Sequence, residues 1–250
     1  MTNYCDTSKL SIRQIDKPTA KKMVVKYHYS KLWTKCSVAL GLFHLTGNEH
    51  SFFDEPEEKM VGVIVYGDPI GRLTGQSISD EIKRTQVLEL TRLFIHDGYG
   101  SNIESWFISQ SFNWLRKNKS EIKALISYAS PVEGHSGTIY QATNWIYQGD
   151  KLRFNDSWSF KFSEDGEWQH GRTIFPYYGT NDPKKIQQQI DKPFWIRKEP
   201  RKHRYVYILA KGGERRKLLK NLKHPTLPYP KSENEVELEI HKLEPIERRG

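Results

Sequence analysis

The sequence predicts an α+β fold in which helices flank a mixed, twisted sheet and a basic extension follows at the C-terminus. Two observations predict it. Short apolar segments of strand type alternate with segments of helical spacing, and one strand–helix–strand succession has the order of a parallel crossover. The surplus of Lys and Arg is confined to a late segment. We expect a core over residues 1–165 and a C-terminal region over residues 166–250 that packs on this core.

The first expected elements are a helix and a hairpin. Asp16 and Pro18 are helix start signals, and the apolar residues that follow them recur at helical spacing. Residues 37–45 and 59–66 are apolar enough for two paired strands joined by a polar loop. Residues 67–84 are rich in Gly, Ser and Pro, which predicts a surface loop.

A central strand, a glycine loop, a helix and a second strand come next. Residues 87–96 carry apolar side chains on both faces, as a central strand does. The loop at 97–102 contains two glycines, and the apolar spacing after it predicts a helix over 103–118. Residues 123–129 form the second strand. Because a helix connects the two strands, we expect them to pair in parallel.

The rest of the chain has a less regular pattern. A short helix is expected over 138–147, a strand over 157–162 and a late strand over 205–210. Residues 167–191 show no clear element.

The net charge is concentrated in one segment. Lys and Arg exceed Asp and Glu by nine in the whole sequence, and residues 197–224 alone hold eleven Lys and Arg against two acids. Such a confined surplus favours nucleic acid as a partner, and the alternative is a solvated basic tail. Interleaved aromatic residues favour stacking on nucleotides. The residues expected to contact duplex DNA are Arg197, Lys198, Arg201, Lys202, Arg204, Tyr205, Lys211, Arg215 and Arg216.

The composition excludes several classes of protein. The longest apolar runs, such as residues 60–66, are far shorter than the ~20 residues of a membrane span. Residues 1–13 are polar and do not resemble a signal peptide. Cys5 and Cys36 are too few for a disulfide framework or a four-sulfur zinc site. A secreted, membrane-spanning or zinc-finger protein is therefore not expected.

A series of motifs resembles one known family. The motifs are Tyr27-His28-Tyr29-Ser30, Glu89-Leu90-Thr91-Arg92-Leu93, Ser101-Asn102-Ile103-Glu104-Ser105, Ser127-Tyr128-Ala129 and, most specifically, GHSGTIYQATNW at residues 134–145. Over roughly residues 20–150 the chain resembles the Mom family of phage DNA-modification proteins, which are similar in fold to GNAT acetyltransferases. One departure is Ser130, where the family usually has Asp.

The resemblance implies an enzyme that transfers an acyl or carbamoylmethyl-type group to the N6 amine of adenine in duplex DNA and so protects phage DNA from host restriction. It implies acetyl-CoA or a related acyl donor, iron as a further cofactor, and a location in the host cytoplasm without membrane contact. A monomer and a homodimer both stay open. The donor is expected on Phe94, Ile95, Gly98, Tyr99, Gly100, Ser101, Asn102 and Asn144. From the pattern alone, an ordinary tight loop between strand and helix is an equal alternative.

The catalytic candidates are His28, Tyr29, Glu89, His135 and Tyr140. His28 suits a general base or, with Tyr29, a metal ligand, and the plainer alternative is a capping histidine beside a packed tyrosine. His135 lies in a polar loop after a strand, where α/β folds keep ligands. Tyr140 matches the tyrosine with which many GNAT enzymes protonate the leaving thiolate, and core packing is its alternative.

The placement of these residues gives two further expectations. Glu89 and Arg92 lie an odd number of residues apart, so they should face opposite sides of their strand, and a buried ion pair is the alternative role of Glu89. His28, Tyr29 and His135 should meet in one cleft.

Two other functions stay open. The first is an acyltransferase that acts on a small amine or on an aminated, hypermodified DNA base, which needs the donor loop without adenine recognition. The second is a non-catalytic DNA-binding protein that shields sites by occupancy, which needs only the basic segment.

Overall fold

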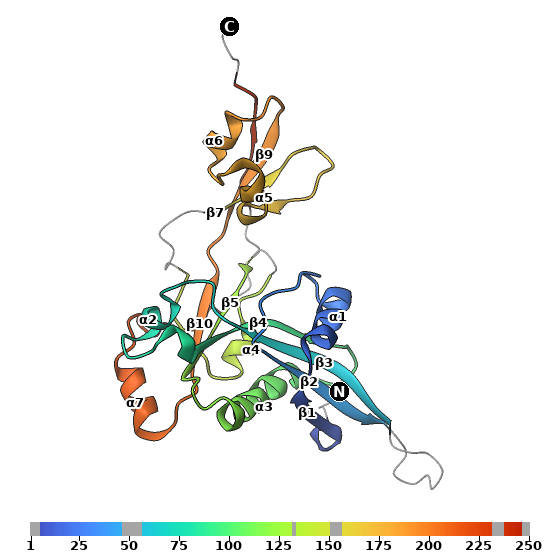
Figure 1. The fold of residues 1–250 in the computed structure, drawn as a ribbon, viewed down its shortest axis with the longest axis vertical. Helices are drawn as coiled ribbons and strands as arrows, with labels where there is room; N and C mark the ends of the chain where they lie inside the picture. Colours follow the sequence, from blue (N-terminus) through green and yellow to red (C-terminus); the bar gives the residue numbers. More distant parts are fainter. Residues whose placement is uncertain (1–5, 47–56, 132–133, 151–156, 232–237, 247–250) are drawn as a thin grey trace. The chain divides into compact units, whose positions relative to one another are not determined.

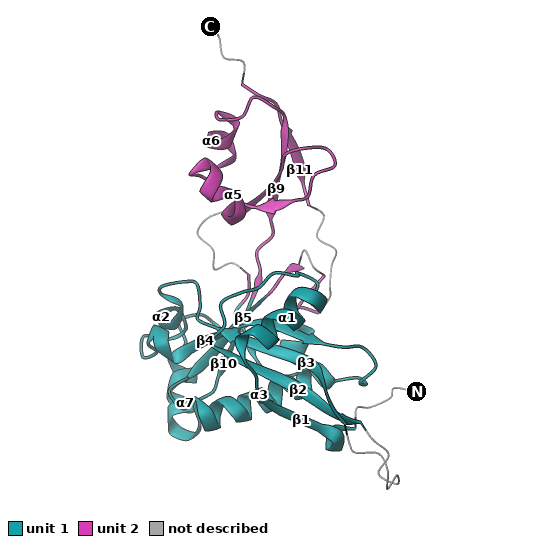
Figure 2. Ribbon diagram, turned by 45° about the vertical axis from the view of Figure 1, so that its right-hand side comes forward, with its two compact units in different colours: residues 1–128, 137–148, 204–229 teal, residues 129–136, 149–203, 230–250 magenta. Residues whose placement is uncertain are grey.

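The computed structural model describes residues 6–46, 57–131, 134–150, 157–231 and 238–246. It divides into two compact units, each assembled from three stretches of the chain (Figure 2). Unit 1 comprises residues 1–128, 137–148 and 204–229, and unit 2 comprises residues 129–136, 149–203 and 230–250. Residue 165, at which the sequence predicts a boundary, lies inside unit 2. In the described part of the chain, no helix has both the length and the apolar character of a membrane span.

A seven-stranded mixed sheet forms the body of unit 1 (Figure 1). Its strands follow the order β1-β2-β3-β4-β5-β10-β6. β4 and β5 pair in parallel, whereas β1 to β4 and the β10–β6 pair are antiparallel, so the predicted crossover is confirmed. The strands are β1 (Leu10–Gln14), β2 (Val38–Thr46), β3 (Glu57–Gly67), β4 (Val87–Ile95), β5 (Ala124–Ala129), β6 (Ile146–Tyr147) and β10 (His203–Ile208).

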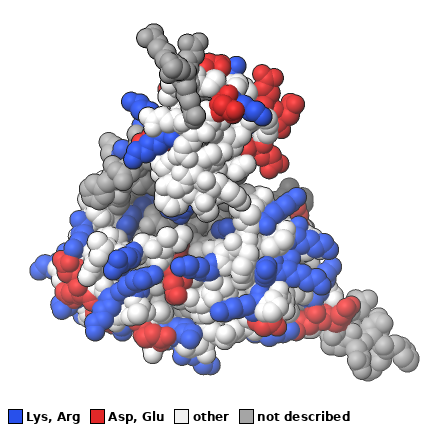
Figure 3. Space-filling view, turned by 45° about the horizontal axis from the view of Figure 1, so that its top comes forward, with Lys and Arg blue, Asp and Glu red and all other residues white. Residues whose placement is uncertain are grey.

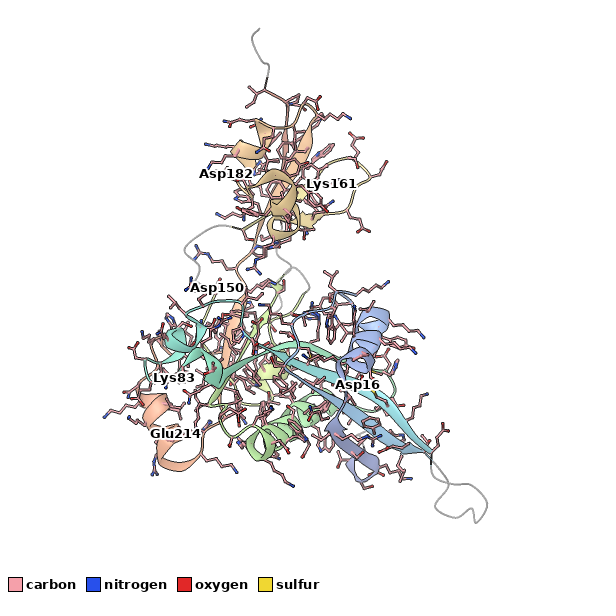
Figure 4. The ribbon with its side chains drawn as sticks, in the orientation of Figure 1. Asp16, Lys83, Asp150, Lys161, Asp182 and Glu214 are labelled. Atoms are coloured by element: carbon pink, nitrogen blue, oxygen red, sulfur yellow. The ribbon has the colours of Figure 1, made fainter. Side chains whose placement is uncertain are left out.

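The helix α1 (Lys17–Tyr27) begins as the sequence predicts. The Asp16 carboxylate, labelled in Figure 4, accepts a hydrogen bond from the Thr19 amide at 2.7 Å, and Pro18 lies in the first turn. Both features stabilise a helix start, because the first amides lack partners within the helix. Ala20 and Val24 are fully buried against β2 and β3, which fixes α1 on one face of the sheet.

The two faces of the sheet carry different helices. The strand register places Val65 of β3 and Val87 of β4 on the same face. Val65 packs with α1, and Val87 packs with Ile78 and Leu218, from α2 (Thr74–Ile78) and α7 (Gly212–Lys220). Tyr66 points to the other face, where its hydroxyl lies 2.6 Å from the Ser111 hydroxyl of α3 (Ile103–Asn118). We call these the α1 face and the α3 face.

Elements predicted between residues 16 and 129, and the strands predicted over 157–162 and 205–210, are confirmed with small shifts at their ends, whereas two other predictions differ. The helix predicted over 138–147 is shorter, because α4 (Thr138–Gln141) ends where Asn144 takes a left-handed conformation with φ of 57°. The Trp145 amide then donates to the Tyr140 carbonyl, and β6 follows. The predicted loop over 67–84 also contains α2.

Unit 2 contains a four-stranded sheet in the order β11-β9-β7-β8 with two helices. Its core consists of Phe160, Ile174, Ile186, Phe194 and Ile196. The Asp182 carboxylate, labelled in Figure 4, caps α6 by accepting from the Lys184 amide at 2.9 Å. The elements are β7 (Ser157–Lys161), β8 (Gln169–His170), α5 (Gly171–Tyr178), α6 (Pro183–Gln187), β9 (Phe194–Glu199) and β11 (Ile240–Leu243). The two helices lie in the region for which no clear element is predicted.

Gly137 is expected to be sensitive to substitution. Its φ is +89°, and a Cβ would lie 2.5 Å from the buried ring of Tyr205. Gly137→Ala should therefore destabilise the protein by about 1–3 kcal/mol, through backbone strain and overpacking together.

The matched control is Gly212→Ala in the same unit, where φ is +57° but a Cβ would meet no atom within 4 Å. Thermal unfolding of both variants measures the difference. Equal melting temperatures would contradict the contribution assigned to the Tyr205 ring.

Candidate functional site

β4 and β5 diverge in the middle of the sheet. Their parallel ladder covers three residue pairs and ends at Glu89 and Ile126. Beyond that point β4 continues to Ile95, paired with β3. We call residues 89–95 of β4 and 126–128 of β5, where the ladder between the two strands ends, the fork. One edge of β4 here has no ladder to β5, so backbone groups along this edge can serve a ligand.

Ser127 bridges the fork at its base. The Ser127 hydroxyl donates to the Leu90 carbonyl oxygen at 2.8 Å and lies 2.8 Å from the Tyr140 hydroxyl. Ser127 is the donor in the contact with Tyr140 as well, so its single proton is shared between two acceptor oxygens and the Tyr140 proton is not used in this pair. A side-chain hydrogen bond thus takes over where the backbone ladder ends.

Tyr140 is a buried phenol held as a neutral acid. Burial is the main cause that raises its pKa to about 12; the hydrogen bond with Ser127 opposes the rise, and the charges of Tyr29 and Glu89 add to it. The ring packs between Trp145 and Tyr205, with ring centroids 5.1 and 5.0 Å away. The packing fixes the ring, and the raised pKa keeps the proton on it at neutral pH.

A β-bulge changes the expected direction of Arg92. Gly67 pairs with Glu89, Tyr66 with Leu90 and Val65 with Arg92, so Thr91 is an extra residue. The bulge restores Glu89 and Arg92 to the same face, the α1 face. The prediction that they face opposite sides is therefore wrong, since it assumed an unbroken alternation along the strand.

His28 and Tyr29 follow the last turn of α1. The His28 amide donates to the Val24 carbonyl, and the Ser30 amide donates to Nδ1 of His28 at 3.1 Å. The neutral imidazole therefore carries its proton on Nε2. His28 is buried, whereas Tyr29 is 62% exposed and has its ring centroid 4.2 Å from that of His28.

Four side chains form one electrostatic group at the fork. Burial lowers the pKa of Arg92, and the charges of Tyr29 and Glu89 oppose that change. The same two residues act on Tyr140, as described above. Ser127 and Tyr140 belong to the α3 face and Glu89 and Arg92 to the α1 face, so the electrostatic interaction between Glu89 and Tyr140 crosses the sheet where the β4–β5 ladder ends.

His135 belongs to unit 2 together with Ser130. The His135 amide donates to the Ser130 carbonyl at 3.2 Å, and Gly134, with φ of +68°, makes the turn between them. The shared cleft of His28, Tyr29 and His135 stays a prediction, because His135 lies in another unit than the other two.

The loop between β4 and α3 can accommodate an anion. Gly98 and Gly100 have φ of +95° and +91°, and the helix start at Asn102 has no side-chain cap. The buried Ser101 Oγ has no hydrogen-bond partner among the described residues. A Cβ at residue 98 would meet open space. Free amides, an unused hydroxyl and open backbone fit the pyrophosphate of an acyl-CoA, whereas the acidic Asp97 and Glu104 beside them do not favour an anion.

The other predicted donor contacts lie along the same part of unit 1. Phe94 and Ile95 end β4, where they pair with Val63 and Gly62 on the side away from the fork. Asn144 is exposed in the turn after α4. The Tyr99 ring lies 5.3 Å from that of His44.

The predicted iron site is not supported by the donor set. No group of three or more His, Cys, Asp or Glu side chains in the described residues can hold a metal ion. His28 also uses Nδ1 to accept a hydrogen bond from the Ser30 amide. His28 and Tyr29 by themselves do not amount to an iron-binding set.

Two residues of the predicted DNA-contacting segment are buried. The Arg204 guanidinium donates to Oε1 of Gln148 at 2.9 Å and to the Ser77 hydroxyl at 2.9 Å, and only 6% of the residue is exposed. Tyr205 is fully buried beside Tyr140. Arg204 and Tyr205 are therefore corrected from DNA contacts to core residues, because they lie on β10 in the interior of the sheet.

The remaining residues of that segment have mixed surroundings. Arg197 stacks 4.5 Å above the Trp168 ring and lies 3.6 Å from Glu199, and Arg215 donates to the Ile208 carbonyl. The exposed members are Lys198, Arg201, Lys202, Lys211 and Arg216. Since Arg197 to Lys202 belong to unit 2 and Lys211 to Arg216 belong to unit 1, the segment is not one continuous element.

Comparison with known proteins identifies the family of the chain. The Mom protein family matches residues 9–231. The chain belongs to the Mom family. The methylcarbamoylase mom of Escherichia phage Mu is 25% identical over 226 residues, which cover 90% of this chain and 85% of that protein. The expected family is therefore confirmed.

Solved acetyltransferase structures are also similar to this Mom protein. The spermidine/spermine N-acetyltransferase SpeG of Vibrio cholerae is 7% identical, with a TM-score of 0.42 over 81% of this chain and 94% of that chain. A Bacillus subtilis acetyltransferase in complex with CoA is 11% identical, with a TM-score of 0.35 over 81% of this chain and all of that chain.

Sequence analysis of this Mom protein missed Ser127 as a member of the site. Serine is common in strands and loops, and its position in the family motif gave no role. The signal that identifies it is structural, namely the end of the β4–β5 ladder one residue earlier.

The raised pKa of Tyr140 has a consequence for stability at high pH. A phenol whose folded pKa is about 12 contributes stability that is complete below its ordinary pKa near 10 and is lost as pH rises from about 10 to 12. Tyr140→Phe should therefore make the melting temperature fall less steeply over this pH range than in the wild type. An unchanged slope would show that Tyr140 is not the buried acid described here.

Proposed function

We propose that this Mom protein is a phage DNA-modification enzyme that transfers an acyl or carbamoylmethyl-type group to the N6 amine of adenine in duplex DNA, in the host cytoplasm. Membership of the Mom family supports this, together with the name of the phage Mu relative, a methylcarbamoylase. Such a relative also supports a transferase-type enzyme. Modified adenine would protect the DNA from host restriction.

The observation that carries the proposal is the electrostatic group at the fork. It combines a neutral buried acid, Tyr140, with Glu89 and Arg92 on the other face of the sheet. A transferase needs a proton donor for the leaving group and an acceptor for the proton of the attacking amine. The fork supplies both from opposite faces, so donor and acceptor substrates could enter from different sides of the sheet.

The roles of these residues follow from their chemistry. An acyl-CoA thioester would supply the activated group when bound at the glycine loop. For transfer of an acyl group, the bond between N6 and the carbonyl carbon would form as the carbon–sulfur bond breaks, which gives an N6-acyl adenine, and Tyr140 would give its proton to the departing sulfur. The carboxylate of Glu89 takes the proton that N6 loses. The Ser127 hydroxyl would stabilise the resulting Tyr140 phenolate by donating a hydrogen bond to it.

Mass spectrometry of nucleosides tests the function. DNA from cells that express the wild-type protein should contain a modified deoxyadenosine, and Tyr140→Phe should remove at least nine tenths of it, because the proton donor is lost. If His28 and His135 act in the site, replacing either one by Ala should remove the modified base and leave the melting temperature nearly unchanged. If they are structural, both variants should instead melt lower. An unmodified adenine pool with a modified thymine-derived base would favour the alternative acyltransferase, and no modified base at all would favour a DNA-binding protein.

Melting experiments test the donor. Acetyl-CoA should raise the melting temperature of the wild type by ligand linkage, and Gly98→Val should abolish the rise, since a branched side chain is strained at positive φ and blocks the loop. The control is Gly179→Val, at a similarly open, left-handed position in unit 2. A wild type whose melting ignores both acetyl-CoA and CoA would refute the donor.

A further inference from the structure

The helix α1 carries an unpaired basic face beside the fork. Lys17, Lys21, Lys22 and Lys26 are all exposed and lie opposite the apolar residues that pack on the sheet. At roughly 3.6 residues per turn they spread over about half of the helix circumference. In Figure 3 a group of blue side chains covers the right side of the larger part, where Figure 1 places α1. We call these four residues the α1 lysine face.

The sequence after Asp16 offers this face no acid on the helix or on the strand that follows it, and the Asp16 carboxylate itself caps the helix by accepting from the Thr19 amide. From Lys17 to Thr46 the sequence has six lysines and neither Asp nor Glu. Within the described residues none of the six forms an ion pair, whereas lysines elsewhere in unit 1 do, for example Lys217 with Glu81 at 2.9 Å and Lys123 with Glu214 at 3.2 Å.

Unrelieved repulsion makes this arrangement unfavourable for the free protein. Lys17 and Lys21, and likewise Lys22 and Lys26, lie at i and i+4, where like charges destabilise a helix. A polyanion laid along the helix would remove that repulsion. The charge pattern therefore fits a bound polyanion better than a merely solvated surface.

The position of the face selects the polyanion. The helix runs directly into His28 and Tyr29, and the exposed Tyr27 ring lies 4.8 Å below the Lys26 ammonium. Lys17 and Lys26 are about 14 Å apart along the helix axis, a length over which one B-DNA strand presents about four phosphates.

We infer that the α1 lysine face holds the phosphate backbone of the DNA next to the target base, so that α1 leads the substrate to the fork. This inference rests on the proposed function, and it assigns DNA contacts to a helix outside the basic segment 197–224. The exposed rings of Tyr27 and Tyr29, 42% and 62% exposed, lie at the end of the phosphate track, where an extruded base would need a stacking surface.

The test compares two triple variants of the full-length protein. Lys21→Gln, Lys22→Gln and Lys26→Gln together should lower the slope of log affinity against log salt for a duplex oligonucleotide by about 2 to 3, the effect of three lost phosphate contacts. The control triple, Lys184→Gln, Lys185→Gln and Lys192→Gln, makes the same charge change at exposed positions of unit 2. It should leave the slope nearly unchanged. Fluorescence anisotropy measures both.

Melting temperatures distinguish a structural effect from a binding effect. The α1 triple should melt no lower than the wild type, because it removes like-charge pairs. An unchanged salt slope, an equal loss in both triples, or a loss confined to an RNA hairpin of the same length would each overturn the inference. Nucleoside mass spectrometry on wild-type cells is independent: if it finds no modified base, the proposed function fails, and the salt slopes still decide whether α1 binds DNA.

Discussion

The end of the hydrogen-bonded ladder between β4 and β5 is the constraint on which the site depends. Two parallel strands that stayed paired would leave no free edge along β4. The Ser127 hydroxyl donates to the carbonyl oxygen of Leu90, the first residue of β4 beyond the ladder, and it also contacts the Tyr140 phenol. The same serine therefore terminates a structural element and positions the acid. Glu89, the last paired residue, supplies the carboxylate at the same place.

Much of this architecture was predictable, and the reasons are local. The capped start of α1, the strands at 87–96 and 123–129 and the helix between them have strong patterns of their own, so their order alone gave the parallel crossover. The family motifs likewise indicated the family to which the chain belongs. These patterns can be recognised without the tertiary structure, because each is contained in a short stretch of sequence.

What could not be predicted depends on pairing between distant residues. The extra residue Thr91 is visible only in the register of β4 on β3, and it reverses the predicted face of Arg92. The burial of Arg204 depends on Gln148 and Ser77, which lie more than fifty residues away in sequence. A count of charges could not separate that arginine from exposed neighbours such as Arg201. The net charge also gave no reason to assign the lysines of α1 to DNA binding, because outside residues 197–224 the numbers of basic and acidic residues are equal.

The interleaving of the two units has a consequence for how the chain folds during synthesis. β10 lies between β5 and β6 in the sheet, yet it is made some seventy residues after β5, after most of unit 2. Until β10 is made, the edge of β5 away from β4 has no partner strand, and the base of the fork is not covered on that side. A ribosome must therefore make residues 149–202, which belong to unit 2, before β10 can close the sheet of unit 1, and late β10 formation delays the enclosure of Tyr140. Truncated chains that end before residue 203 would carry every catalytic candidate and still lack a finished site.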